Sequence, residues 1–81
     1  MNLNVLFFAA ARDVVGTDTV TVDVPDGSTV GELQQLMIQR TPQLERWSVA
    51  LLWAVNNRYA GCDQVLHASD VIACFPPVSG G

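Results

Sequence analysis

One segment of the sequence carries the signals of an amphipathic helix, and strand-like segments flank it on both sides. Residues 29–32 (TVGE) fit a capping box, in which the first and last side chains each satisfy a free backbone N–H at the helix start. Val30, Leu33 and Met37 follow helical spacing and form an apolar stripe that predicts packing against a sheet. Pro42 disfavours helical backbone in the residue before it, so we expect the helix to end there.

Two strands are predicted before this helix. Residues 4–11 (NVLFFAAA) form a short apolar run without strict alternation, which predicts a strand covered on both faces. Residues 19–24 (TVTVDV) alternate and are rich in β-branched side chains, and residues 25–27 (PDG) end that strand with turn residues. Gly16 marks a turn between the two segments, so together they predict an N-terminal hairpin.

Three further strands are predicted after the helix. Residues 51–55 (LLWAV) and 71–75 (VIACF) are apolar runs, and Asn56-Asn57 suits a tight turn into residues 58–60. The order is therefore β-β-α-β-β-β, and 81 residues leave room for one domain. This order predicts an α+β fold in two layers, with one main helix on one face of a mixed sheet.

A sheet with its helix on one side leaves the other face open. If the alternating positions of the first and last strands face the helix (Leu3, Val5, Phe7, Ile72 and Cys74), their neighbours Phe8 and Phe75 point to the open face. Placement of both phenylalanines in the core is the alternative, and the residues alone favour neither. Trp53 lies within a strand and is expected in the core, whereas Trp47 fits either the core or a partner contact.

Composition excludes several classes of function. The net charge is −4, and the chain has four arginines and no lysine, so we expect no nucleic-acid partner. No apolar run approaches about 18 residues and the start of the chain has no basic region, so we expect a cytoplasmic protein without a membrane segment. Cys62 and Cys74 form no CxxC motif, so we expect no metal site and buried or idle thiols, although a disulfide is possible.

Other polar residues carry little catalytic signal. His67 stands without a nucleophile motif and is expected in a loop. Asp26, Asp63 and Asp70 are expected in turns, because aspartate hydrogen-bonds locally there.

The end of the chain is the most informative segment for function. Pro76-Pro77 stops the last strand, so we expect a domain over residues 1–77 and a flexible tail over residues 78–81 (VSGG). A frayed terminus is the ordinary interpretation of such a tail. Against it, two terminal glycines can enter a channel too narrow for any Cβ. Four extended residues reach at most about 13–14 Å, which is enough to place a carboxylate inside a partner.

Three features together resemble a known family. VLFF near the start, VIACFPPVSGG at the end and the β-β-α-β-β-β order are similar to the small subunit of molybdopterin synthase, the MoaD-like sulfur carriers. The resemblance covers essentially the whole chain. The FPPVSGG ending is specific, whereas a bare Gly-Gly is shared with the thiamine sulfur carrier, the tRNA-thiolating ubiquitin-related modifier and ubiquitin.

The resemblance implies a ubiquitin-like β-grasp fold and a non-catalytic, sulfur-donating role. Gly81 would be adenylated with ATP by a ubiquitin-activating-type adenylyltransferase, and then converted to a thiocarboxylate with sulfur from a donor protein. The sulfur would pass to cyclic pyranopterin monophosphate in molybdenum cofactor biosynthesis. The carrier itself would bind no cofactor, and the catalytic side chains would belong to the large subunit.

The resemblance also implies where partners bind. Val78, Ser79 and Gly80 would thread into the large subunit, in an assembly that is usually a heterotetramer. The open sheet face would bind that subunit, with Phe8, Arg12, Tyr59 and Phe75 as the candidate contacts. Three alternatives remain at this point: sulfur carriage for thiamine or tRNA thiolation, a ubiquitin-like protein modifier, and a plain interaction module.

Overall fold

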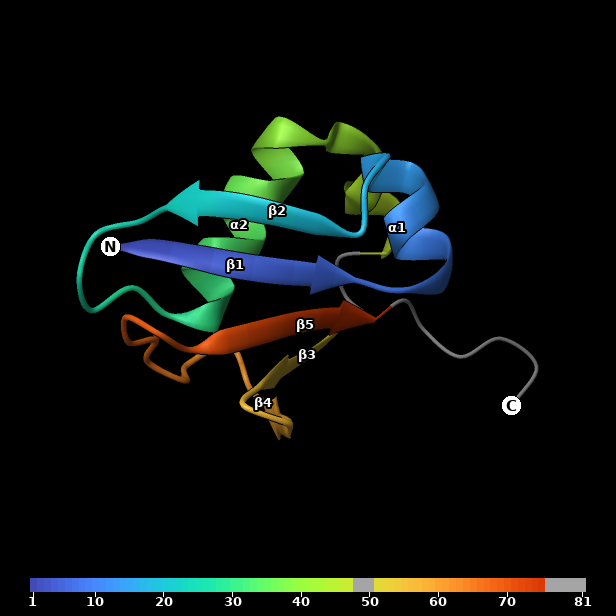
Figure 1. The fold of residues 1–81 in the computed structure, drawn as a ribbon. Helices are drawn as coiled ribbons and strands as arrows, with labels where there is room; N and C mark the ends of the chain where they lie inside the picture. Colours follow the sequence, from blue (N-terminus) through green and yellow to red (C-terminus); the bar gives the residue numbers. More distant parts are fainter. Residues whose placement is uncertain (48–50, 76–81) are drawn as a thin grey trace.

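The computed structural model describes residues 1–47 and 51–75, and it has the predicted α+β, β-grasp architecture (Figure 1). Its elements follow in the order β1 (Asn2–Phe7), α1 (Ala9–Val15), β2 (Thr19–Asp23), α2 (Val30–Arg40), the 3₁₀ helix η1 (Pro42–Trp47), β3 (Leu52–Val55), β4 (Arg58–Ala60) and β5 (Val71–Phe75). The strands form one mixed sheet in the order β2-β1-β5-β3-β4.

The first and last strands lie side by side at the centre of the sheet. β1 pairs with β5 in parallel, with Phe7 opposite Cys74. β2 pairs antiparallel with β1, and β3 pairs antiparallel with both β4 and β5. Because β1 and β5 run the same way, the residues that follow both strands meet at one edge of the sheet.

Helix α2 covers one face of the sheet and closes the core (Figure 1). Its capping box is confirmed: the Glu32 N–H donates to Thr29 Oγ1 at 3.2 Å, and the Thr29 N–H donates to Glu32 Oε1 at 3.0 Å. The predicted end is confirmed as well, since the helix stops at Arg40, before Pro42. The apolar stripe is buried, and so are the inward residues of the central strands (Val30, Leu33, Met37, Leu3, Val5, Phe7, Ile72 and Cys74).

The two N-terminal strands pair antiparallel as predicted, but the predicted turn between them is wrong. β1 ends at Phe7, and residues 9–15 form helix α1 instead of extending the strand to residue 11. Gly16 ends this helix with a left-handed φ of 90°, and its N–H donates to the Arg12 carbonyl oxygen at 2.8 Å. The apolar run at 4–11 thus contains both the end of a strand and the start of a helix, and its alanines favour the helix. Helix η1 was not predicted either.

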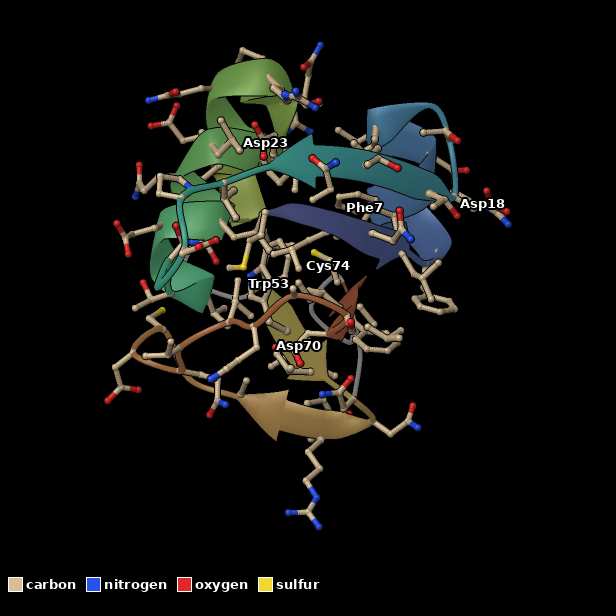
Figure 2. All side chains as sticks on the ribbon, turned by 60° about the vertical axis from the view of Figure 1, so that its left-hand side comes forward. Phe7, Asp18, Asp23, Trp53, Asp70 and Cys74 are labelled. Carbon is tan, nitrogen blue, oxygen red and sulfur yellow. The ribbon has the colours of Figure 1, made fainter. Side chains whose placement is uncertain are left out.

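Several smaller predictions are confirmed. Asn56 and Asn57 adopt left-handed φ angles of 53° and 70° between β3 and β4. Trp53 is buried, and its Nε1 donates to Gln34 Oε1 at 2.7 Å. Cys74 is buried and Cys62 is exposed, and both are free thiols. In Figure 2, Phe7, Trp53 and Cys74 lie toward the middle of the molecule, whereas Asp18 lies at its edge.

Some predictions concern residues outside the described part of the chain. The boundary at residue 77, the tail over 78–81 and Pro76-Pro77 all fall there, as does the side chain of Trp47. Within residues 1–47 and 51–75, no helix is long and apolar enough to cross a membrane.

Candidate functional site

The sheet face opposite α2 carries an apolar hollow with a volume of about 300 Å³. It forms because residues of β1 and β5 that alternate with the core positions point outward, as the strand period requires. Its lining residues come from β1, β3, β4 and β5 and from the ends of these strands: Leu6, Phe8, Ala54, Asn57, Tyr59, Val71, Ala73 and Phe75. We call this surface the open face.

Two aromatic rings stack at one end of the open face. The ring centroids of Phe8 and Phe75 lie 4.9 Å apart, and the ring planes are inclined by 9°. The parallel register of β1 and β5 brings them together, since the Phe8 N–H donates to the Cys74 carbonyl oxygen at 3.3 Å. Phe8 is nevertheless 43% exposed, so the stacked pair forms part of the surface.

The structure brings together three of the four residues predicted to contact a partner. Phe8, Phe75 and Tyr59 line the same hollow, and Tyr59 is 77% exposed on β4. Arg12 lies elsewhere, on α1, where its Nε is 4.0 Å from Asp13 Oδ1. Arg12 therefore does not share the hollow with the other three residues.

Sequence reasoning missed other apolar residues of this face. Val71 is a large exposed side chain, and Ala73 lines the hollow together with Val71 and Phe75. Their signal was available, because every second residue of β5 shares the outward face with Phe75.

Behind the open face, the Cys74 thiol is inert. Burial raises the pKa of Cys74 to about 12, so the thiol stays protonated near neutral pH. Since the thiolate is the nucleophilic form, Cys74 serves as a small core residue, as its sequence context predicts. No three His, Cys, Asp or Glu side chains of residues 1–47 and 51–75 are grouped so that they could hold a metal ion.

A second, polar hollow of about 460 Å³ lies at the other end of β5, among residues that include Asn56, Arg58, His67 and Asp70. Asp70 Oδ1 accepts from Asn56 Nδ2 at 2.9 Å, and Oδ2 accepts from the His67 N–H at 2.7 Å. Desolvation alone would raise the pKa of Asp70, but these hydrogen bonds and the nearby His67 outweigh it and lower that pKa below its ordinary value. The carboxylate thus ties the 56–57 turn to the loop before β5, which is the local bonding expected of a turn aspartate.

The remaining predicted site residues are Val78, Ser79, Gly80 and Gly81, which lie outside the described residues. Phe75 is the last residue of β5, and only Pro76-Pro77 separate it in sequence from the predicted tail.

The chain is similar to known proteins over nearly its whole length. The model of the ThiS family matches residues 5–81. The molybdopterin synthase sulfur carrier subunit of Escherichia coli strain K12 is 43% identical, and the match covers 98% of this chain and 99% of the relative.

Solved structures resemble it as well. The crystal structure of SAMP1, small archaeal modifier protein 1, from Haloferax volcanii has a TM-score of 0.87 at 31% identity and covers all of both chains. The structure of the "putative molybdopterin converting factor, subunit 1" from Pyrococcus furiosus has a TM-score of 0.86 at 28% identity, and covers 96% of this chain and 99% of the other.

Proposed function

The chain belongs to the ThiS family, and we propose that it is the sulfur carrier subunit of molybdopterin synthase. The observation that carries this proposal is the nearly end-to-end match to the E. coli sulfur carrier subunit. The FPPVSGG ending agrees with it, because a carrier of this kind needs a terminal glycine as its reactive group.

The chemistry requires activation of the Gly81 carboxylate. A carboxylate is a poor electrophile, so an adenylyltransferase first joins it to the α-phosphate of ATP and releases pyrophosphate. A hydrosulfide-level sulfur from a donor protein then displaces AMP, which leaves a thiocarboxylate. Its sulfur attacks an electrophilic carbon of cyclic pyranopterin monophosphate, and a carbon–oxygen bond at that carbon breaks, so that the oxygen group leaves with a proton. Water then cleaves the resulting thioester, which restores the Gly81 carboxylate and leaves the sulfur on the pterin.

None of these steps needs a side chain of the carrier. The inert Cys74 agrees with this division of labour, in which the partners supply the acids and bases. The tail supplies reach and a narrow backbone, and the domain supplies a surface for docking. The proposal places the protein in the reducing cytoplasm, where Cys62 and Cys74 remain thiols.

The open face is the surface we assign to the large subunit. Phe8, Phe75 and Tyr59 provide the aromatic side chains that are enriched at the centres of interfaces. The stacked rings of this hollow lie where β5 ends, so a subunit docked there is within reach of the tail. Arg12, on α1, lies outside this hollow, and its contact with a partner stays a prediction.

Deletion of Gly81 tests the proposal. We expect the shortened chain to keep its thermal unfolding midpoint and to lose formation of the dithiolene product in a reconstituted synthase. The matched control is Ser79→Ala, which changes the tail without removing its reactive end and should retain most of the activity. Product formation by the chain without Gly81 would refute the carrier function, and a large fall in the midpoint would assign a structural role to Gly81.

A protein modifier is the second candidate, because the chain resembles SAMP1 of Haloferax volcanii over its full length. Intact mass spectrometry of the protein from its native host separates the two functions. A carrier is recovered as a free chain in which sulfur replaces one oxygen, whereas a modifier is recovered in covalent adducts with other proteins. Loss of the host's thiamine or thiolated tRNA on gene deletion, with the molybdenum cofactor intact, would instead indicate a different sulfur pathway.

A further inference from the structure

The start of helix α1 breaks two rules of local structure at adjacent positions. Phe8 is the N-cap residue and its side chain makes no capping hydrogen bond, although Ser, Thr, Asp and Asn are preferred there. Ala9 has a left-handed φ of 52°, a conformation that is unfavourable for a residue with a Cβ. Unfavourable local conformations cluster at functional sites, where the surrounding structure maintains them.

The side chain held in place here is the ring of Phe8. Phe8 keeps an extended backbone, with φ −122° and ψ 152°, so it continues the alternation of β1. Phe7 therefore points into the core, and Phe8 points outward. The left-handed turn at Ala9 then starts α1 at once, so that the Phe8 ring stays beside Phe75.

Phe75 is the last residue of β5, so the chain leaves the sheet there. Its main chain pairs with Leu52 of β3, and on the other side the β1 ladder ends with Phe7 opposite Cys74. The stacking of the Phe8 and Phe75 rings therefore restrains Phe75, which lies one residue beyond the last pair of this ladder. Phe75 also precedes Pro76, and a residue before proline is confined to extended conformations.

We propose that Phe8 is a positioning residue, whose ring holds Phe75 and so sets the direction in which the chain leaves β5 toward Gly81. This inference rests on the proposed carrier function. Six residues follow Phe75, which extend to roughly 20 Å. When the large subunit holds the tail extended, a change of about 10° in its direction at Phe75 would displace the far end by about 3 Å over that length. Because a misplacement of about 1 Å can cost about 100-fold in rate, a weak contact at the base of the tail has a large effect at its end.

The test separates positioning from simple contact. Phe8→Leu keeps an apolar side chain on the open face but removes the stacked ring, and Phe8→Tyr keeps the ring. The matched control is Tyr59→Leu, which removes an aromatic ring from the same hollow on a different strand. For each thiocarboxylated variant, we would measure the Kd for the large subunit and the single-turnover rate of sulfur transfer at saturating large subunit.

We expect Phe8→Leu to lower the saturated rate by about tenfold or more, Phe8→Tyr to restore it, and Tyr59→Leu to change the Kd alone. A saturated rate for Phe8→Leu within about twofold of the unmutated chain would overturn the inference and make Phe8 a contact residue only. If Phe8→Leu does not fold, a saturated rate for Phe8→Tyr within that range remains the expected result, and a tenfold loss would overturn the inference.

Residual dipolar couplings of the amides at residues 78–81 give a readout that needs no partner. We expect couplings that report a preferred direction in the unmutated chain and smaller ones in Phe8→Leu. Equal couplings in both would overturn the inference. If the unmutated chain transfers no sulfur at all, the proposed function fails, and the couplings still decide whether Phe8 orients the tail.

Discussion

The main-chain N–H of Gly31 donates to the carbonyl oxygen of Cys62 at 2.9 Å, so the first turn of α2 rests directly on the loop after β4. A Cβ on Gly31 would lie 3.2 Å from that oxygen and 3.3 Å from Cys62 Cβ. The close approach of these two residues therefore favours glycine at this helix position, because a Cβ would make the loop shift by a few tenths of an ångström.

Gly31→Ala should destabilise the domain by about 1 kcal/mol, although alanine is the better helix former. The added methyl group pushes on a backbone carbonyl that already accepts the hydrogen bond from residue 31. Chemical denaturation followed by circular dichroism measures the change, and Gln35→Ala on the exposed side of α2 is the control. A variant as stable as the unmutated chain would show that the loop yields easily.

The two thiols should react very differently. Cys62 is exposed, whereas Cys74 is buried with its pKa raised to about 12. Iodoacetamide at pH 8 should therefore add one label to the folded chain and two labels in denaturant, as counted by intact mass. Cys62→Ser should take up no label while folded. Rapid double labelling of the native chain would mean that the core around Cys74 opens readily.

The Asp70 carboxylate should make stability depend on pH in the acid range. Its pKa is lowered from the ordinary value of 3.8, so its contribution is complete above that value and is lost as the pH falls through the lower folded value. Asp70→Asn should cost about 1 kcal/mol at pH 7, since one amide group cannot accept both hydrogen bonds.

The free energy of unfolding at pH 6 and at pH 2.5 measures this difference. The gap between the unmutated chain and Asp70→Asn should narrow as the pH falls and the carboxyl takes up a proton. A gap that is the same at both pH values would show that ionised Asp70 does not stabilise the fold.

Gly80→Val should block the pathway far more than Ser79→Ala, and neither change should unfold the domain. A carrier tail must enter both the activating enzyme and the synthase, and these close around it to exclude water from the reactive acyl group. A β-branched residue next to Gly81 adds bulk at the narrowest point. Ser79→Ala removes at most one hydrogen bond, worth about 0.5–1.5 kcal/mol.

Rates of ATP-dependent thiocarboxylate formation and of product formation distinguish these two tail variants, with circular dichroism of each isolated domain beside them. Equal rates for Gly80→Val and the unmutated chain would mean that no tight channel surrounds the terminal glycines.

The sequence alone determined the elements whose signals are local. The Thr29–Glu32 capping box and Pro42 set both ends of α2, because a cap and a proline act within a few residues. Asn56-Asn57 set the β3–β4 turn in the same way. Alternation determined which residues of β5 face the core, since a strand has a fixed period of two.

Only the tertiary structure decided where β1 ends and what Phe8 touches. The apolar run at residues 4–11 fits either a strand or a buried helix, and periodicity does not separate the two. Strand alternation placed Phe8 and Phe75 on the same face of the sheet, but it did not show whether that face is open or covered. The parallel pairing of β1 with β5 brings the ring centroids of Phe8 and Phe75 to 4.9 Å, whereas Arg12 lies apart from them on helix α1. Contacts between the two ends of a chain depend on strand order, and strand order results from burial of the whole core, which no local pattern encodes.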